Sequence, residues 1–263
     1  MKAIILAAGK GSRLLPITNK IPKSLIEFGN TSILEKLIRN LRECGISDIS
    51  VVVGHNANKI NLLNIKKFEN KNYENTNMLY SLFCAEKEID ESVIISYADI
   101  IFEKQILEKL IAINEDISIV VDTKWLNYWK FRIENPLDDA SETVIMDSNK
   151  YGISIGQEVN DVNQVDGHFI GLMKVQKEGI KKFKDLYHKS KMISNDNYNP
   201  LNKNCLFKNS RLVDLIHKLI VEGNKVKVVE TKNGWLEFDT LKDYEIYNNL
   251  KEKNLLKDII RLE

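Results

Sequence analysis

Short apolar runs alternate with amphipathic segments through the first half of the chain. Four apolar runs predict buried strands: Ala3–Ala8, Ile49–Val53, Val93–Ser96 and Ile117–Val121. Helical spacing of apolar residues predicts helices at Ser32–Cys44, Thr76–Glu88 and Lys104–Ile113, and a further helix is expected to start near Asn58. Because strands and helices alternate with short connections, we expect a parallel, doubly wound sheet with right-handed crossovers.

The second half is less regular, although neither a repeat nor a long linker separates it from the first. Shorter strands, some of them antiparallel, are predicted at Val144–Asp147, Gly152–Ile155, Gly171–Val175 and Lys225–Val229. Helices are predicted at Glu178–Ser190, Arg211–Glu222 and Leu241–Leu255. We therefore expect one α/β domain over residues 1–263, with a smaller antiparallel elaboration at 122–170 and a C-terminal helical segment at 241–263.

The composition is that of a globular chain with balanced charge. Hydrophobic residues make up 43% and charged residues 29% of the 263 positions, which excludes a disordered chain. Lysine and arginine total 38 against 37 aspartate and glutamate residues, a formal net charge of +1. Neither nucleic acid nor a membrane is therefore expected as the main partner, and any phosphate-binding patch must be local.

Cysteine usage and the N-terminus both indicate a cytoplasmic protein. Cys44, Cys84 and Cys205 lie far apart and have no metal-ligand spacing, which is typical of incidental thiols in a cytosolic chain. The first apolar run is followed by Lys10 and Arg13 and is too short for a signal peptide or a membrane span.

The opening MKAIILAAGKGSRLLPITNKIPKSL places a glycine-rich loop after the first strand. Gly9 and Gly11 allow the backbone to approach a phosphate, Arg13 adds a permanently charged fork, and Lys23 follows Pro22. The spacing matches neither the dinucleotide-binding fingerprint nor the P-loop, in which lysine directly follows the last glycine. A glycine-rich turn with two solvated cations is the alternative, but the full string favours phosphate chemistry.

The string LAAGKGSRLLP followed by PKSL resembles the signature of the nucleotidyltransferases that make NDP-sugars and related activated compounds. This resemblance implies a Rossmann-like fold, a nucleoside triphosphate substrate, a phosphorylated acceptor, Mg²⁺ and release of pyrophosphate. It also implies that Arg13 neutralises the β- and γ-phosphates and that Lys23 stabilises charge at the α-phosphorus. The residues implied to hold the nucleotide in this segment are Leu6, Ala8, Gly9, Gly11 and Ser12.

The same resemblance implies a metal site made of two distant aspartates. Asp99 follows the predicted strand in SVIISYADIIF, and Asp239 lies in GWLEFDTLKDY. Hard carboxylate oxygens suit Mg²⁺, although each aspartate could instead cap the helix that follows it. The family often shows Asp-x-Asp, whereas Tyr97 stands at the first of these positions. Glu237 is expected beside the pair, as an outer partner or on the acceptor side.

Within the family, the chain resembles the small cytidylyltransferases that act on phosphocholine or aminoethylphosphonate. The segment NTNMLYSL is similar to their Asn-x-x-Tyr-Ser segment, which implies that Asn77 and Ser81 face the base and ribose of CTP. The Gly-Thr-Ala-Gly-type segment of glucose-1-phosphate enzymes is missing from the sequence. The alternative for this segment is a helix that simply buries its apolar residues.

The acceptor is expected to be recognised by the segment DTKWLNYWKFR. Asp122, Lys124 and Arg132 would bind a substrate with phosphate, amine and carboxylate groups, such as phosphoglutamine used in making bacterial capsule modifications. Trp125 and Trp129 share a helix face and either enclose a quaternary ammonium or anchor the core. His168 would reach the acceptor or simply pack beside its strand.

Several alternatives stay open at this point. The acceptor could be phosphoglutamine, aminoethylphosphonate, phosphocholine or a sugar 1-phosphate, and UTP could replace CTP. A catalytically silent nucleotide-binding regulatory relative is disfavoured because Arg13, Lys23, Asp99 and Asp239 are all present. An NAD-binding oxidoreductase is disfavoured by the missing third glycine. The sequence also allows a homodimer.

Overall fold

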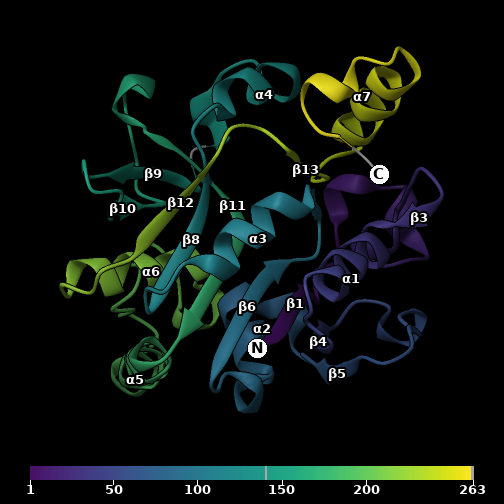
Figure 1. Cartoon of the computed structure of the whole chain (residues 1–263). Coiled ribbons are helices and arrows are strands. Elements are labelled where there is room, and N and C mark those ends of the chain that lie inside the picture. Colours follow the sequence, from purple (N-terminus) through teal and green to yellow (C-terminus); the bar gives the residue numbers. More distant parts are fainter. Residues whose placement is uncertain (140, 262–263) are drawn as a thin grey trace.

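A mixed β-sheet forms the centre of the molecule (Figure 1). The computed structural model describes residues 1–139 and 141–261. Within them, nine strands form this sheet: β1 (Lys2–Ala7), β4 (Asp48–Val53), β5 (Lys66–Glu69), β6 (Ser92–Tyr97), β8 (Ile117–Asp122), β9 (Thr143–Met146), β10 (Gly152–Ile155), β11 (Gly167–Gln176) and β12 (Lys227–Thr231).

The sheet is parallel where the strand–helix alternation predicts it. Strand β1 pairs in parallel with β4 and β6, β4 pairs with β5, and β8 pairs with β12. The long strand β11 runs antiparallel between β6 and β8, and the hairpin of β9 and β10 joins its beginning. The prediction of a doubly wound, mostly parallel α/β fold with a smaller antiparallel part is confirmed.

Helices cover the sheet and its upper edge. They are α1 (Ile33–Glu43), α2 (Met78–Cys84), α3 (Lys104–Ala112), α4 (Trp125–Arg132), α5 (Glu178–Ile193), α6 (Leu212–Val221) and α7 (Leu241–Glu252). Helices α1 and α3 contact each other in front of the sheet in Figure 1, whereas α6 contacts α2 and α5. Helices α4 and α7 contact each other at the top of the view.

Four short strands complete the fold. They are β2 (Glu27–Phe28), β3 (Thr31–Ser32), β7 (Ile100–Phe102) and β13 (Trp235–Glu237). Strands β2 and β3 form a hairpin, and β7 pairs antiparallel with β13. The second pairing links the chain directly after β6 to the chain directly before α7, although the two segments are far apart in sequence.

The sequence pattern explains the local structure, as α1 illustrates. Ser32 caps this helix by accepting a hydrogen bond from the backbone of Glu35, whose carboxylate accepts one from the Ser32 backbone. The apolar positions of the helix are all buried: Ile33, Leu34, Leu37, Ile38 and Leu41. Burying each side chain of this size stabilises the fold by about 1.5–3 kcal/mol.

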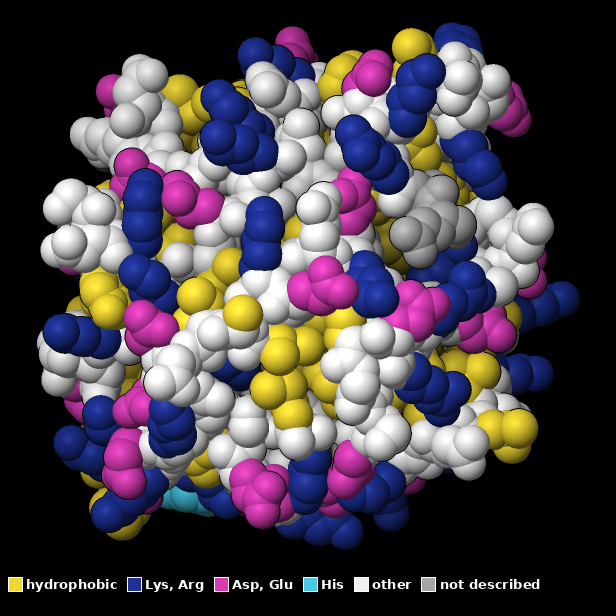
Figure 2. Space-filling view, in the orientation of Figure 1, with side chains coloured by type: hydrophobic (Ala, Val, Ile, Leu, Met, Phe, Trp, Pro, Cys, Tyr) yellow, Lys and Arg dark blue, Asp and Glu magenta, His cyan; other side chains and the backbone are white. Residues whose placement is uncertain are grey.

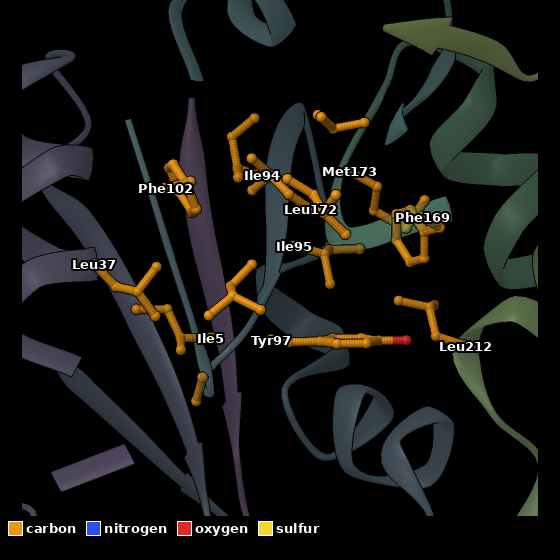
Figure 3. Close-up of a cluster of buried hydrophobic side chains, with 14 of the residues drawn as sticks. Ile5, Leu37, Ile94, Ile95, Tyr97, Phe102, Phe169, Leu172, Met173 and Leu212 are labelled. Carbon is orange, nitrogen blue, oxygen red and sulfur yellow. The ribbon is translucent and has the colours of Figure 1, made fainter. Parts of the chain in front are cut away.

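The core lies on both faces of the central strands (Figure 3). Ile5 of β1, Ile94 and Ile95 of β6, and Leu172 of β11 are fully buried. Tyr97, at the end of β6, lies in the same cluster, and its hydroxyl points toward Leu212 in Figure 3. The continuous apolar runs therefore correspond to strands covered on two faces.

Two predicted elements are wrong in kind or position. The helix expected near Asn58 is only a 3-10 turn at Ala57–Lys59, and the edge strand β5 follows it. This strand was hidden because its KKFE sequence is mostly exposed and lacks an apolar run. Strand β11 begins at Gly167 and not at the predicted Gly171. Gly171 (φ +79°) lies inside the strand, where the β8–β11 register shifts, so this glycine marks an irregularity and not the start of the strand.

Other boundaries differ by a turn of helix. Helix α2 begins at Met78 and ends at Cys84, and a 3-10 turn at Glu86–Glu88 replaces its predicted continuation. The division into one domain with an elaboration at 122–170 and a C-terminal segment at 241–263 stays a prediction. Residue 140 of the first region and residues 262–263 of the second lie outside the described residues.

The surface agrees with the balanced composition. On the face shown in Figure 2, lysine and arginine side chains are interspersed with aspartate and glutamate. Across residues 1–139 and 141–261, no helix is both long and apolar enough to span a membrane. The thiols of Cys44, Cys84 and Cys205 are free.

Candidate active site

A cavity of about 490 Å³ opens at the carboxyl ends of β1 and β6. Ligands of open α/β sheets bind at this edge. The lining comes from segments throughout the chain: Leu6–Gly9, Gly11–Arg13, Lys23, Ser24, Tyr73, Thr76–Met78, Ser81, Tyr97–Asp99, Ser141, Glu142, His168, Arg211, Glu237 and Asp239. We call this space the central cavity.

The glycine-rich loop forms one wall of the central cavity. Gly11 has φ +65°, and a Cβ placed on it would lie 2.9 Å from the Cβ of Lys23. The Oγ1 atom of Thr18 donates a hydrogen bond of 2.8 Å to the carbonyl of Gly11. The turn therefore needs glycine, both for its left-handed backbone and for the close approach of Lys23.

The loop does not lead into an α-helix. Three 3-10 turns follow it, at Ser12–Leu14, Ile17–Asn19 and Lys23–Leu25, and the first α-helix begins at Ile33. The positive charge of this wall therefore comes from Arg13 and Lys23 and not from a helix N-terminus.

Lys23 bridges the two predicted metal-binding aspartates. Its Nζ atom lies 2.6 Å from Oδ2 of Asp99 and 2.9 Å from Oδ1 of Asp239. The other oxygen of Asp239, Oδ2, lies 2.7 Å from Nη1 of Arg13. The structure thus brings together four of the residues that the sequence motifs single out.

The pairing of β7 with β13 places the two aspartates side by side. Asp99 lies between β6 and β7, and Glu237 pairs with Ile100 at the end of this ladder. The backbone N–H of Phe238 then donates a hydrogen bond of 2.8 Å to the carbonyl of Asp99. Neither aspartate is a helix cap, because Asp99 lies between strands and Thr240 caps α7. The helix-cap alternative is therefore wrong.

The carboxylates and cations at the site alter one another's pKa values. Burial would lower the pKa of Lys23, but Asp99 and Asp239 outweigh it and raise the pKa above its usual value. Burial would raise the pKa of Asp239, but Lys23 and Arg13 hold it below its usual value. Lys23 is therefore a fixed cation and Asp239 a fixed anion near neutral pH.

Glu237 differs from the two aspartates. Burial raises its pKa to about 7, and the charges of Asp239 and Asp99 add to this effect against that of Arg132. Its Oε2 atom accepts a hydrogen bond of 2.8 Å from Nη1 of Arg132. Glu237 lines the central cavity, as the sequence-based prediction requires of an outer partner or an acceptor ligand.

The two aspartates fit a magnesium ion by their chemistry. Both present hard oxygen atoms to the cavity, and Oδ1 of Asp99 is buried with no hydrogen-bond partner. Mg²⁺ is commonly held by one or two carboxylates together with substrate phosphates. In keeping with such a small set, the part of the chain that the structure describes holds no cluster of three or more His, Cys, Asp or Glu side chains arranged for a metal.

The predicted nucleotide-binding residues line the cavity. Leu6, Ala8, Gly9 and Ser12 belong to the loop wall, and Asn77 and Ser81 belong to the wall at α2. Asn77 is the N-cap of α2, where its side chain accepts a hydrogen bond from Met78 N.

A hydrogen bond from a neighbouring segment fixes the polar wall near Asn77. The hydroxyl of Ser81 accepts a hydrogen bond of 2.9 Å from Asn70. Leu79 and Leu82 of the same helix are buried, as the apolar alternative expects. Contact of Asn77 and Ser81 with the base and ribose stays a prediction.

Four predicted acceptor ligands lie outside the cavity lining. Asp122 is fully buried and accepts hydrogen bonds from Trp235 Nε1 at 2.9 Å and from two backbone N–H groups. Lys124 is exposed, and Trp125 is buried against Trp129 with 5.8 Å between ring centroids. The structure therefore gives Asp122 and Trp125 places in the scaffold.

Arg132 is the fourth of these residues. Its side chain is 2% exposed and pairs with Glu237 and Asp243. The expected joint site of Asp122, Lys124 and Arg132 does not form in this structure, because their contacts point to different partners. Direct contact of any of the four with an acceptor stays a prediction.

His168 lies on the cavity and in the core at once. It lines the central cavity, its Nδ1 atom is 3.0 Å from the carbonyl oxygen of Phe169, and its ring packs 4.2 Å from that of Trp129. The packing expected of this histidine is therefore seen, whereas its contact with the acceptor stays a prediction.

Sequence reasoning missed Arg211 and Glu142. Arg211 precedes α6 and donates hydrogen bonds to the carbonyls of Ser141 and Gly156 and to Asp214. Glu142 lies beside the hydroxyl of Tyr97. Burial raises the pKa of this tyrosine, and the carboxylate of Glu142 raises it further. Neither residue lies in a recognisable motif. The sequence could not reveal them, because their shared place on the cavity depends on contacts between distant segments.

Comparisons with known proteins agree with this geometry. The model of the MobA-like NTP transferase domain family matches residues 3–149. The chain belongs to this family and is an enzyme of the nucleotidyltransferase class, as the resemblance in the sequence predicted.

Individual relatives extend this result. The chain is 37% identical to the CTP:phosphoglutamine cytidylyltransferase of Campylobacter jejuni, over 94% of this chain and 98% of the relative. It is 36% identical to the choline-phosphate cytidylyltransferase of Streptococcus pneumoniae, over 39% of this chain and 47% of that protein. The solved structure of the CTP:phosphocholine cytidylyltransferase from Streptococcus pneumoniae shares the fold, with a TM-score of 0.69 at 20% identity, over 95% and 98% of the two chains.

Proposed function

We propose that this enzyme transfers CMP from CTP to a small phosphorylated acceptor and releases pyrophosphate. The observation that carries the proposal is the bridge of Lys23 between Asp99 and Asp239 in the central cavity. The relatives whose names specify CTP and a phosphorylated acceptor support the choice of substrates.

The reaction needs positioning and charge more than proton transfer. A phosphate oxygen of the acceptor attacks the α-phosphorus of CTP, and the bond from this phosphorus to the oxygen bridging to the β-phosphate breaks. Pyrophosphate leaves with the electron pair of that bond. Because the attacking oxygen is already an anion, no general base is required. Charge stabilisation at the α-phosphate and the leaving group supplies the catalysis.

Two cations of the loop wall fit these roles. Lys23, held by two carboxylates at a depth where 15% of its side chain is exposed, stabilises the charge at the α-phosphorus. The side chain of Arg13 is 69% exposed and lines the mouth of the cavity, where it neutralises the β- and γ-phosphates. A guanidinium fork suits two phosphate groups, and a compact ammonium suits one reacting centre.

Asp99 and Asp239 are the residues that would hold Mg²⁺. The ion would neutralise phosphate charge and polarise the reacting phosphoryl group. Lys23 already balances part of the negative charge of this pair, and Arg13 balances part of the remainder.

A phosphoglutamine-type acceptor fits the charges on the wall formed by the 122–170 region. Ser141, Glu142 and His168 come from this region, and Arg211 is hydrogen-bonded to the carbonyl of Ser141. A carboxylate is suited to Arg211 and an ammonium group to Glu142. Aminoethylphosphonate and phosphocholine each have the cation but lack the carboxylate, so the arginine favours a phosphorylated amino acid.

The test is a pyrophosphate-release screen that crosses four nucleoside triphosphates with four acceptors. The acceptors are phosphoglutamine, aminoethylphosphonate, phosphocholine and a sugar 1-phosphate. We expect release with CTP and phosphoglutamine, and a rise in the acceptor KM in Arg211→Met with little change in the CTP KM. Release only with a sugar 1-phosphate would favour an NDP-sugar pyrophosphorylase, and nucleotide binding without any release would favour a silent regulatory relative.

A homodimer is part of the same proposal. Light scattering of the purified enzyme checks it, and a monomer mass at the concentrations used for the assay would remove it without affecting the reaction.

A further inference from the structure

Arg132, the last residue of α4, has its guanidinium buried beside the active-site carboxylates. Nε and Nη2 donate hydrogen bonds of 2.9 and 3.1 Å to the two carboxylate oxygens of Asp243. Nη1 donates a third, of 2.8 Å, to Oε2 of Glu237. The face of the guanidinium lies against Trp129, with Cζ 4.6 Å from the ring centroid. A planar fork that spans two carboxylates is a geometry that lysine cannot reproduce.

Asp243 connects this arginine to the segment that holds Asp239. Its Oδ2 atom accepts hydrogen bonds from the backbone N–H of Asp239 at 3.1 Å and of Thr240 at 2.8 Å. The same carboxylate thus binds Arg132 and fixes the main chain at the residue whose side chain contacts Lys23.

Glu237 is held at the other end of the same segment. Its backbone N–H donates to the hydroxyl of Tyr128 at 2.8 Å, and its carbonyl accepts from the hydroxyl of Tyr247 at 2.9 Å. Tyr128 belongs to α4 and Tyr247 to α7. Helices α4 and α7 therefore both hold the backbone of Glu237, and Arg132 joins the carboxylates of Glu237 and Asp243.

We propose that Arg132 is a positioning residue for nucleotidyl transfer. Through Asp243 and Glu237 it holds Asp239 at the place where Asp239 meets Lys23. The inference rests on the proposed function, since it assigns the arginine to the cytidylyl-transfer site. The alternative is that Arg132 contacts the acceptor. The three hydrogen bonds that its guanidinium donates are directed at Asp243 and Glu237, and the residue does not line the central cavity.

The test compares two variants with a control. Arg132→Lys keeps the charge and loses the fork, and Asp243→Asn keeps the shape and loses the ion pair. Lys174→Met is the control, because Lys174 is a buried cation that bonds to the carbonyls of Ile111 and Ile113 away from the cavity. Two quantities are measured for each protein. Steady-state kinetics give kcat and the acceptor KM, and amide hydrogen exchange reports on the peptide covering residues 237–243.

We expect kcat to fall by about tenfold to a hundredfold in Arg132→Lys and Asp243→Asn, because misplacing a reacting group by about 1 Å has an effect of this size. The acceptor KM should stay within about twofold of the value for the unmodified enzyme. The variants leave the groups that bind the acceptor in the ground state unchanged. Exchange of the 237–243 peptide should accelerate in both variants while exchange of β1 stays slow. Lys174→Met should lose thermal stability and retain kcat.

Two results would overturn the proposal. A higher acceptor KM at unchanged kcat would make Arg132 an acceptor ligand. Loss of kcat in all three proteins, with faster exchange throughout the chain, would make its role purely structural. If Arg132→Lys does not fold, Asp243→Asn decides the question. If the unmodified enzyme does not use CTP with any acceptor, the proposed function fails, whereas exchange at 237–243 still decides whether Arg132 positions Asp239.

Discussion

The Nζ atom of Lys23 lies 2.6 Å from Oδ2 of Asp99, a residue 76 positions further along the chain. The contact joins the 3-10 turn at Lys23–Leu25, which follows β1 and the glycine-rich loop, to the chain directly after β6. Since β1 and β6 are adjacent and parallel, their carboxyl ends meet at one edge of the sheet. The ion pair is therefore a direct consequence of the strand order, and it sets the charge balance of the central cavity.

Replacement of Lys23 should slow turnover strongly while the chain still folds. In Lys23→Ala, we expect kcat to fall by about a hundredfold to a thousandfold, the range found when one preorganised charge-stabilising group is removed. Lys20→Ala removes an exposed lysine of the same loop and is the matched control. Pyrophosphate release measures the rate, and circular dichroism checks the fold. A Lys23→Ala enzyme as fast as Lys20→Ala would contradict the role given to this lysine.

Gly11 should be irreplaceable for a local reason. Gly11→Ala adds left-handed strain of about 1–2 kcal/mol, and its Cβ would lie 2.9 Å from the Cβ of Lys23. Gly45 has φ +82° with nothing within 4 Å of an added Cβ, so Gly45→Ala carries the strain without the clash.

Thermal melting and kcat separate the two effects of these glycine variants. We expect both variants to lose stability and only Gly11→Ala to lose turnover, by about a hundredfold. Equal kcat values in the two variants would show that the approach of Lys23 to Gly11 is unimportant.

Replacement of Asp122 distinguishes the acceptor-binding role predicted from the sequence from the hydrogen-bonding role seen in the structure. In Asp122→Asn, an amide group replaces an acceptor that binds Trp235 Nε1, Asn233 N and Lys124 N, so we expect stability to fall by about 1–3 kcal/mol. The KM for the acceptor should stay within about twofold. Chemical denaturation and steady-state kinetics measure the two quantities. A large rise in the acceptor KM, with stability unchanged, would instead place this carboxylate in contact with the substrate.

His217 should contribute a loss of stability in mild acid, which the raised pKa of Glu237 opposes. Burial lowers the pKa of this histidine below its usual 6.5, despite the nearby charge of Asp214. Just below pH 6.5 this histidine therefore binds more protons in the unfolded chain than in the folded one, so its contribution to the free energy of unfolding decreases as the pH falls through this region.

His217→Gln should reduce this pH dependence. The Nδ1 atom of His217 lies 3.5 Å from the backbone N of Ile155, and a glutamine oxygen can accept the same hydrogen bond without titrating. Urea denaturation from about pH 5 to about pH 8 measures the difference between the two proteins. Parallel curves for the variant and the unmodified chain would contradict the assignment.

The sequence predicts the alternation of buried strands and helices from short-range apolar patterns, whereas the family resemblance, and not local spacing, implied that Lys23, Asp99 and Asp239 meet in one site. Apolar runs identify strands that are covered on two faces, and a parallel sheet brings the residues after those strands together. Strand β5 escapes this reasoning because an edge strand such as Lys66–Glu69 has no need of an apolar run.

Charged residues on the acceptor side show where such reasoning ends. The positive charge of Arg132 is typical of a residue that binds an anion. Its partners Glu237 and Asp243, however, are 105 and 111 positions away and bury it. Arg211 carries no motif, yet tertiary contacts place it on the cavity. Burial and long-range pairing decide both roles, and neither is encoded in local spacing.

Transfer of CMP from CTP to a phosphorylated amino acid can be followed by ³¹P NMR. CTP, phosphoglutamine and Mg²⁺ are incubated with the enzyme and, separately, with the Lys23→Ala variant. We predict that the phosphorus signal of phosphoglutamine is replaced by two coupled diphosphate signals, with one pyrophosphate formed per product, and that this conversion is at least about a hundredfold slower in the variant sample. An unchanged spectrum with the unmodified enzyme, or pyrophosphate without a new diphosphate, would contradict the account.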